Sequence, residues 1–278
     1  MTTPSVRRNR RTTRILQVTG ASAAALLAVS ACSSSDDSSG ASDSASSSSS
    51  SDKLSGTVTV FAAASLQESF TKLGKQFEKQ HPGTKVTFSF GGSDSLAASI
   101  TGGAPADVFA AASPKTMKIV TDKGDAAGTP ATFVRNQLEI ATLPGNPDKV
   151  SSLKDLTNKD LKVVLCAKEV PCGAAAEKAL EGSKLKLTPV SYEQDVKAAL
   201  TKVELKEADA AVVYKTDVHA AGDKVEGVEF PESTGAINDY PIAQLKESKN
   251  SAAAKAFIAL VQSAEGQKVL TSAGFLQP

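Results

Sequence analysis

Strand-like and helix-like segments alternate along the chain from residue 53 onward. Residues 57–62 (T-V-T-V-F-A) form a β-rich run, which predicts a strand. Residues 65–80 follow with apolar side chains at spacings of three and four, which predicts an amphipathic helix. The same patterns predict further strands at 85–90, 107–111, 137–142, 162–165, 210–214 and 240–243. They predict further helices at 96–100, 174–181, 194–202 and 251–264, and one that opens at Ser113-Pro114.

This alternation favours an α/β fold in which mostly parallel sheets are covered by helices on both faces. Residues 53–278 are long enough for two such sheets. In open sheets of this kind a ligand binds at the carboxyl ends of the strands, where helix N-termini point into the crevice. The junctions between strands and helices are therefore the places to look for a site.

The first 31 residues have a different character. Arginines in the first 14 residues precede an apolar stretch at 15–31, which ends in Val-Ser-Ala before Cys32. The stretch is too short and too polar for a membrane span, which needs about 20 mostly apolar residues. It predicts a lipoprotein signal peptide at residues 1–31, with Cys32 as the acylated residue. The alternative is a disordered basic tail beside a weak amphipathic helix. The pair Arg10-Arg11 also permits twin-arginine export, so the route stays open.

Residues 33–51 are nearly all Ser, Ala, Asp and Gly, without one large apolar side chain. Such a segment cannot bury enough apolar surface to offset the entropy of ordering, so residues 32–52 are predicted to be a lipidated cysteine and a flexible linker. We expect the protein to be anchored through Cys32 on the extracytoplasmic face of a cell membrane, on the periplasmic side or at the cell surface.

Charge narrows the set of partners. The chain has 31 basic and 30 acidic residues, and the loss of the arginine-rich signal would leave a mildly acidic protein. Nucleic acid is therefore not an expected partner. No later segment approaches the length of a membrane helix, so the acyl chain is expected to be the main attachment. We expect a monomer.

Two cysteines remain once Cys32 is assigned to lipidation. Cys166 and Cys172 are six positions apart in a chain that is predicted to be exported, which favours a disulfide. In the chain-entropy model so short a loop contributes about 2 kcal/mol. A metal pair is the alternative, but His81 and His219 are the only histidines and neither lies nearby in the sequence.

Three strand-to-helix junctions carry glycine or small hydroxyl residues: 62–66 (A-A-A-S-L), 90–94 (F-G-G-S-D) and 171–173 (P-C-G). Free backbone N–H groups at helix N-termini, with serine hydroxyls beside them, can bind an anion. No lysine or arginine lies within these junctions, so the predicted site is neutral and rich in donors. Ser65 with Glu68 could instead form a capping box, Gly91-Gly92 a turn, and Tyr214 a core aromatic.

Several strings in the same order resemble one known family. They are V-F-A-A-A-S-L (60–66), F-G-G-S-D-S-L-A (90–97), G-A-P-A-D-V-F (103–109) and A-V-V-Y (211–214). Together they closely resemble the molybdate-binding proteins of ABC importers, and the similarity runs from about Gly56 to Phe275. The resemblance implies a two-lobed periplasmic-binding-protein fold of type II, in which each lobe is a mixed, mostly parallel sheet flanked by helices. It implies that residues 53–135 and 238–278 form lobe 1 and residues 136–237 form lobe 2.

The resemblance also implies the ligand set. Matched motif by motif, Ser65 and Ser93 would each donate a hydroxyl and a backbone N–H, Cys172 and Val196 a backbone N–H, and Tyr214 its hydroxyl. The family usually has alanine where this chain has Cys172, a departure that matters little if only the N–H is used. Molybdenum would be bound as an oxyanion without direct metal ligands, and no cofactor is implied.

Donors without acceptors suit a fully deprotonated dianion such as molybdate or tungstate, and also sulfate, whereas hydrogen phosphate carries a proton that would find no partner. The implied function is capture of molybdate for the membrane permease of an ABC importer. A receptor for sulfate or another tetrahedral oxyanion is the alternative. An exported hydrolase with Ser65 as nucleophile is less favoured, because no Gly-x-Ser-x-Gly elbow surrounds that serine.

Overall fold

The computed structural model describes residues 53–278. The predicted signal peptide at 1–31, the acylated Cys32 and the linker at 32–52 lie outside the described residues. Within the described part, no helix is both long and apolar enough to cross a membrane.

The first sheet contains strands from both ends of the described chain. Its order is β2-β1-β3-β10-β4, with β1 (Gly56–Ala63) parallel to β2 (Thr84–Gly91) and to β3 (Val108–Ala110). The fourth neighbour, β10 (Asn238–Gln244), runs antiparallel to β3 and to β4 (Ala131–Asn136). The strands thus bring residues more than a hundred positions apart into one sheet.

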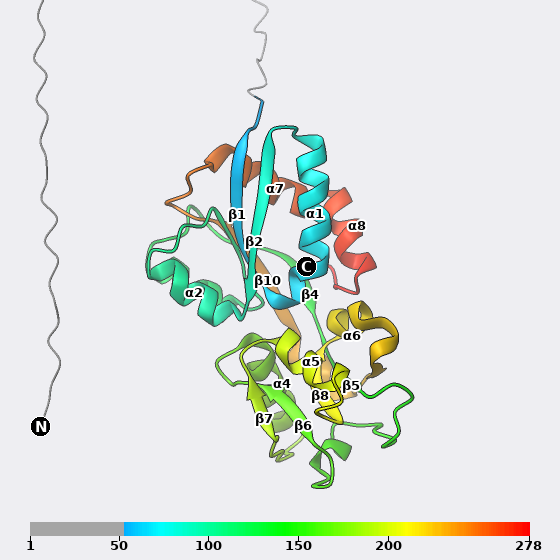
Figure 1. The fold of residues 1–278 in the computed structure, drawn as a ribbon. Coiled ribbons are helices and arrows are strands. Elements are labelled where there is room, and N and C mark those ends of the chain that lie inside the picture. The colour runs from blue at the N-terminus through cyan, green and yellow to red at the C-terminus, as the bar shows by residue number, and fades with distance from the viewer. Residues whose placement is uncertain (1–52) are drawn as a thin grey trace, which may run out of the picture. The chain divides into compact units, whose positions relative to one another are not determined.

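Helices cover both faces of this sheet (Figure 1). Helices α1 (Gln67–Gln80), α7 (Ser251–Gln262) and α8 (Ala264–Ser272) pack together on one face. There Phe257 makes T-shaped contacts with Phe70 and Phe77 at centroid distances of 5.9 and 5.6 Å. Helices α2 (Ser93–Thr101) and α3 (Pro114–Asp122) bury a second, smaller apolar cluster on the other face. Burial of these two apolar faces holds the first sheet together.

The second sheet is built from the middle of the chain. Its order is β7-β6-β8-β5-β9, with bounds β5 (Leu138–Thr142), β6 (Val163–Cys166), β7 (Ser191–Glu193), β8 (Ala210–Tyr214) and β9 (Glu226–Val228). Its helices are α4 (Pro171–Gly182), α5 (Val196–Glu204) and α6 (Lys215–Ala221). Short 3₁₀ segments lie between the other elements: η1 (Ala64–Leu66), η2 (Asp155–Thr157), η3 (Gly222–Lys224) and η4 (Pro231–Ala236).

The chain passes between the two sheets twice. It leaves the first sheet between β4 and β5, at Gln137, and it returns between β9 and β10. The α/β class, the two mixed sheets and the flanking helices agree with the sequence prediction. The parallel share is smaller than expected, because two of the four strand pairings in each sheet are antiparallel.

Each predicted strand and helix is present, with ends that differ by a few residues. The pattern missed strands β4, β7 and β9 and helices α6 and α8. Strands β7 and β9 are three residues long and partly exposed, so they carry too few positions for an apolar period. The predicted helix at 251–264 ends at Gln262, because Ser263 is extended and accepts a hydrogen bond from the Gly266 N–H at 3.1 Å as the N-cap of α8.

Candidate functional site

One small cavity lies where the carboxyl ends of β1, β2 and β8 meet the helix N-termini that follow the strands. The cavity is small, with an empty volume of about 200 Å³. The first sheet and its loops contribute Ala63, Ala64, Ser65, Gly91, Gly92, Ser93 and Ala112 to the lining. The second sheet and its helices contribute Val170, Pro171, Cys172, Asp195, Val196 and Tyr214. All five residues that the resemblance implies as ligands therefore line the same cavity.

Four of these residues sit at the start of a helix. Ser93 and Val196 are the first residues of α2 and α5, Cys172 follows Pro171 at the start of α4, and Ser65 lies in the 3₁₀ turn η1. Within residues 53–278 the backbone N–H groups of these four residues have no acceptor. Helix N-termini leave such N–H groups unpaired and carry partial positive charge, so the cavity is suited to an anion.

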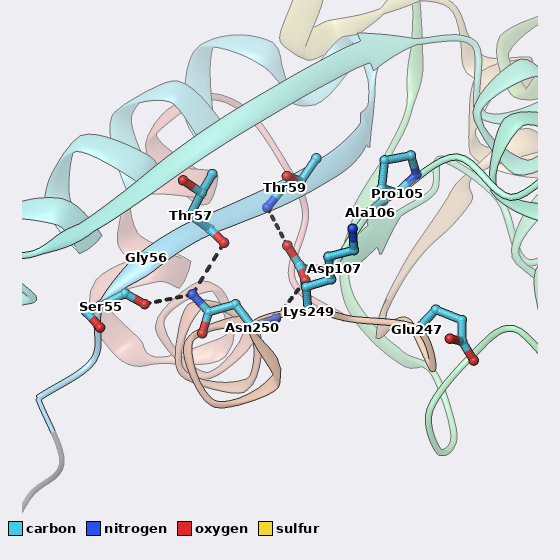
Figure 2. Close-up of a pocket in the computed structure, with 10 residues that line it drawn as sticks. All are labelled: Ser55, Gly56, Thr57, Thr59, Pro105, Ala106, Asp107, Glu247, Lys249 and Asn250. Carbon is cyan, nitrogen blue, oxygen red and sulfur yellow. Dashed lines mark hydrogen bonds between the residues drawn. The ribbon is translucent and has the colours of Figure 1, made fainter. Parts of the chain in front are cut away.

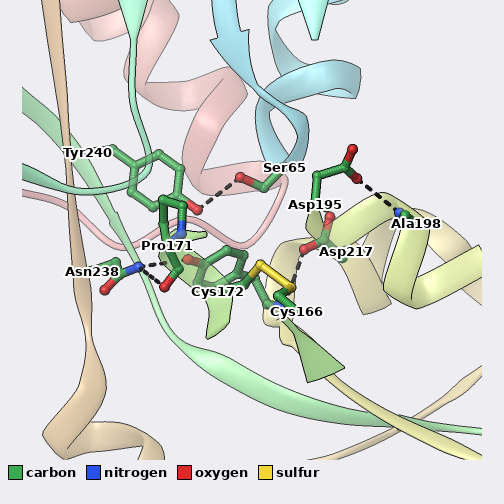
Figure 3. Close-up of a disulfide and its surroundings, with 10 residues drawn as sticks. Ser65, Cys166, Pro171, Cys172, Asp195, Ala198, Asp217, Asn238 and Tyr240 are labelled. Atoms are coloured by element: carbon green, nitrogen blue, oxygen red, sulfur yellow. Dashed lines mark hydrogen bonds between the residues drawn. A yellow bond between two sulfur atoms is a disulfide. The ribbon is translucent and has the colours of Figure 1, made fainter. Parts of the chain in front are cut away.

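Three hydroxyl groups join these N–H groups in the cavity lining. The Ser93 Oγ accepts a hydrogen bond from the Ala112 N–H at 3.0 Å, and the Tyr214 hydroxyl accepts one from Asn238 Nδ2 at 2.6 Å. The Ser65 Oγ lies 2.9 Å from the hydroxyl of Tyr240 (Figure 3). Burial raises the pKa of Tyr214 well above its ordinary value, so this hydroxyl keeps its proton and remains a donor.

Three alternatives from the sequence can be compared with these contacts. The capping box of Ser65 and Glu68 is wrong, because helix α1 begins at Gln67 and Leu66 is its N-cap without a side-chain hydrogen bond. Tyr214 is a buried aromatic, packed edge-on against Tyr240 at a centroid distance of 6.0 Å, and it lines the cavity as well. Gly91-Gly92 does more than turn the chain, because both glycines line the cavity.

The two halves of the site approach each other closely at Gly92. A Cβ atom at this position would lie 2.5 Å from the backbone oxygen of Gln194, which precedes α5. Ordinary Cβ contacts begin at about 3.4 Å, so only glycine permits this approach. The structure therefore has a closed cleft.

Cys166 and Cys172 form a disulfide, with an S–S distance of 2.07 Å (Figure 3). The prediction of a disulfide is confirmed, and the alternative of a metal pair is wrong. The bond joins the end of β6 to the first turn of α4, directly beside the N–H of Cys172. Gly173 lies equally close to the loop before α4, because a Cβ there would be 1.9 Å from the Ala167 oxygen. Both features hold the start of α4 in place.

Charged side chains lie near the cavity, but no lysine or arginine belongs to its lining. The Lys197 Nζ lies 2.9 Å from Glu68 of α1 and 3.2 Å from Asp217 of α6. Burial raises the pKa of Asp217 to about 6, while the charge of Lys197 opposes that shift. Asp195 is the one acid in the lining, and its Oδ1 accepts the Ala198 N–H at 2.9 Å as the N-cap of α5 (Figure 3).

The site depends on residues that sequence reasoning missed. Asn136, Asn238 and Tyr240 lie at the start or end of strands β4 and β10, beside the crossovers between the sheets, and their side chains bond the cavity hydroxyls or each other. A polar N-D-Y run at 238–240, just ahead of an expected strand, was the available signal. Ala112 and Val170 line the cavity without any sequence signal of their own.

A larger cavity of about 870 Å³ opens at the other end of β1 (Figure 2). Its main polar group, the buried Asp107 carboxylate, already accepts hydrogen bonds from the Thr59 N–H at 2.7 Å, the Ser248 hydroxyl at 2.7 Å and the Asn250 N–H at 3.1 Å. These bonds tie β1 to the loop before α7. The cavity lies at the amino end of the strand, away from the strand ends where ligands bind in open sheets.

No group of three or more His, Cys, Asp or Glu side chains in the described part of the chain is arranged to hold a metal ion. The two mixed sheets and the donor-lined cavity between them define a fold of the periplasmic-binding-protein type II class. The family model for bacterial extracellular solute-binding proteins matches residues 58–276. The chain belongs to that family and is a solute-binding protein rather than an enzyme.

A relative supports the same family assignment, and two solved structures share the fold. The molybdate-binding protein ModA of Mycobacterium tuberculosis is 43% identical over 222 residues, which cover 80% of this chain and 85% of the relative. The periplasmic molybdate-binding protein of Azotobacter vinelandii has a TM-score of 0.70 at 22% identity and covers 80% of this chain and 99% of its own. The sulfate-binding protein SubI of Mycobacterium tuberculosis has a TM-score of 0.67 at 18% identity, with coverages of 79% and 86%. At such identities the two structures show the fold alone.

Proposed function

We propose that this protein captures molybdate, and also tungstate, in the cavity between the two sheets and delivers it to an ABC importer. The observation that carries the proposal is the convergence of the backbone N–H groups of Ser65, Ser93, Cys172 and Val196, together with the hydroxyls of Ser65, Ser93 and Tyr214, on one small closed cavity. The similarity to the ModA protein of Mycobacterium tuberculosis supports molybdate as the ligand.

The chemistry of the donors explains why a tetrahedral dianion fits. Each oxygen of a fully deprotonated oxyanion can accept hydrogen bonds, and hydrogen bonds to a charged group contribute about 1.5–3 kcal/mol each. The N-termini of α2, α4 and α5 add partial positive charge without a competing cation. Sulfate meets the same conditions, and the structural similarity to SubI keeps a sulfate receptor as the second candidate.

Closure of the cleft completes the site. We propose that residues 53–135 and 238–278 move as lobe 1 and residues 136–237 as lobe 2, about the two crossovers. Strand membership supports these bounds, since β4 ends at Asn136 and β10 begins at Asn238. Closing brings Ser65 and Ser93 of lobe 1 toward the donors of lobe 2, removes water from the anion and strengthens each contact.

We also propose a location for this function. The signal at residues 1–31 and the acylated Cys32 would tether the protein to the extracytoplasmic face of the membrane, and residues 33–52 would let the folded part reach the permease. The match to an extracellular solute-binding family supports a site of action outside the cytoplasm. We expect the receptor to act as a monomer.

Isothermal titration calorimetry on residues 53–278 tests the ligand assignment, because these residues belong to one compact unit. Molybdate, tungstate and sulfate are titrated separately into the same protein. We expect tight binding of molybdate and tungstate with one anion per chain, and much weaker binding of sulfate. Sulfate binding as tight as molybdate would select the second candidate, and no binding of any of the three would reject oxyanion capture.

A further inference from the structure

Each of the three cavity hydroxyls has a hydrogen-bond partner on the side away from the cavity, and for Ser93 and Tyr214 that partner donates. The simplest case is Ser93, whose Oγ accepts the Ala112 N–H at 3.0 Å in buried surroundings. A backbone N–H can only donate, so the Ser93 oxygen must act as the acceptor in this contact. The hydroxyl proton of Ser93 is therefore free to point at a ligand.

Tyr214 is oriented in the same way by a side-chain amide. Asn238 Nδ2 lies 2.6 Å from the Tyr214 hydroxyl and 3.2 Å from the carbonyl oxygen of Pro171. A carbonyl oxygen can only accept, so the amide must present its NH₂ group rather than its oxygen on this side. The Tyr214 oxygen accepts from that NH₂ group, so its own proton is free to point at another acceptor, such as a ligand in the cavity.

Ser65 is oriented through a longer chain of contacts. Asn136 Oδ1 accepts the Gln137 N–H at 3.0 Å, which fixes the amide so that Nδ2 faces the Tyr240 hydroxyl at 3.3 Å. Tyr240 therefore accepts from Asn136 and can give its single proton to the Ser65 Oγ, 2.9 Å away. The proton of Ser65 is then the one that remains for a ligand.

We propose that Asn136, Tyr240 and Asn238 are specificity-determining positioning residues, which fix the hydroxyl protons of Ser65 and Tyr214 toward the bound anion. The inference rests on the proposed function and deepens it, because it names what makes the site a set of donors. A hydroxyl could accept a proton from a ligand only by turning its own proton elsewhere, and the amides occupy that side. A protonated oxyanion is therefore rejected for lack of an acceptor.

Sulfate and hydrogen phosphate form the matched pair of probes. Both are tetrahedral dianions of similar size, and hydrogen phosphate differs by one proton. Competition with bound molybdate gives the affinity of each at a mildly alkaline pH, in the wild-type protein and in Asn238→Leu. The leucine removes the NH₂ group that donates to the Tyr214 oxygen, so the Tyr214 proton can turn away from the cavity and its oxygen can accept from the ligand.

We expect Asn238→Leu to lower the ratio of sulfate affinity to hydrogen phosphate affinity by about tenfold or more. This is the effect of giving the proton of hydrogen phosphate an acceptor that it lacks in the wild-type site. Tyr240→Phe keeps the ring volume and interrupts the second chain of contacts, so it should lower the ratio in the same direction even if Asn238→Leu fails to fold. Gln244→Leu is the control, because it removes an amide from the same strand that bonds Ser251 at the far end. It should leave the ratio unchanged.

If these residues had a merely structural role, their replacement would weaken the binding of both anions equally. The inference would be overturned if both variants lost affinity for the two anions equally. It would also be overturned if the affinity for hydrogen phosphate did not rise relative to that for sulfate in either variant. The proposed function fails separately: if wild-type protein does not bind molybdate, sulfate and hydrogen phosphate are titrated directly, and their ratio still tests the orientation of the protons.

Discussion

Gly92→Ala adds one methyl group at the closest approach between the two halves of the cleft. In the closed structure the new Cβ would lie 2.5 Å from the Gln194 oxygen, against about 3.4 Å for an ordinary contact. The backbones must therefore separate by about 0.9 Å, the difference between these two distances. The Asp94 side chain, whose Oδ1 would be 2.7 Å away, can turn aside, whereas the backbone oxygen has no such freedom.

That separation acts on the anion through the donors of the second sheet. A hydrogen bond of about 2.9 Å that is stretched by 0.9 Å is largely lost. Cys172, Val196 and Tyr214 supply the donors on that side, and each contact to a charged ligand contributes about 1.5–3 kcal/mol. Partial readjustment of the loop before α5 would recover some of this. We expect a loss of about 2–4 kcal/mol, which corresponds to roughly 30- to 1,000-fold weaker molybdate binding.

Calorimetric titration with molybdate measures the effect, with Gly182→Ala as the control. A Cβ at Gly182, the last residue of α4, would meet nothing within 4 Å, and Gly182 does not line the cavity, so this variant should bind like the wild type. Ligand-free Gly92→Ala should melt near the wild-type temperature, because an open cleft relieves the clash. Binding by Gly92→Ala within about threefold of wild type would refute the argument, as would an equal loss in Gly182→Ala.

Three further predictions concern single groups around the site. Tyr214→Phe removes one donor to the anion, so molybdate affinity measured by calorimetry should fall by about 1–3 kcal/mol while the melting temperature changes little; unchanged affinity would remove Tyr214 from the ligand set. Replacing Cys166 and Cys172 together by alanine should lower the free energy of unfolding in urea by about 2 kcal/mol and leave molybdate binding measurable, since the N–H at position 172 remains. Asp217 is buried and its pKa is raised to about 6, so its contribution to stability is present below its unfolded pKa of about 4 and is lost as the pH rises through about 6. Asp217→Asn, with Lys197 still paired to Glu68, should gain stability relative to wild type by up to about 3 kcal/mol between those pH values, and parallel melting curves against pH would contradict this.

Much of the fold could be predicted from the sequence because its signals are local. The spacing of Leu66, Phe70, Leu73 and Phe77 marks one buried helix face, and all four are fully buried. Ser113 before Pro114 marks the start of α3, where its Oγ accepts the Thr116 N–H at 3.2 Å. Strands as short as β7 and β9 carry no period to read, and their pairing with neighbours forms them.

The ligand set could be predicted only in part from the sequence. Glycine and serine after a strand predict free N–H groups at a helix start, and the structure gathers the N-termini of α2, α4 and α5 at one cavity. The motifs that occur in the same order as in the family suggested which residues belong to one site. The bonds that hold their hydroxyls could not be predicted, because Ser65 and Tyr240 are 175 positions apart and Asn136 and Tyr240 are 104 apart.

The sequence by itself determined the succession of strands and helices, the donor-rich junctions and a cysteine pair close enough to bond, since each depends on residues within a few positions of one another. Only the tertiary structure decided that Gly92 meets Gln194 across the cleft, and that Asn238 and Tyr240 stand behind Tyr214 and Ser65. The physical reason is the return of the chain from the second sheet to the first. That return sets β10 beside β3 and β4, and no local propensity encodes which distant polar groups then come within hydrogen-bonding distance.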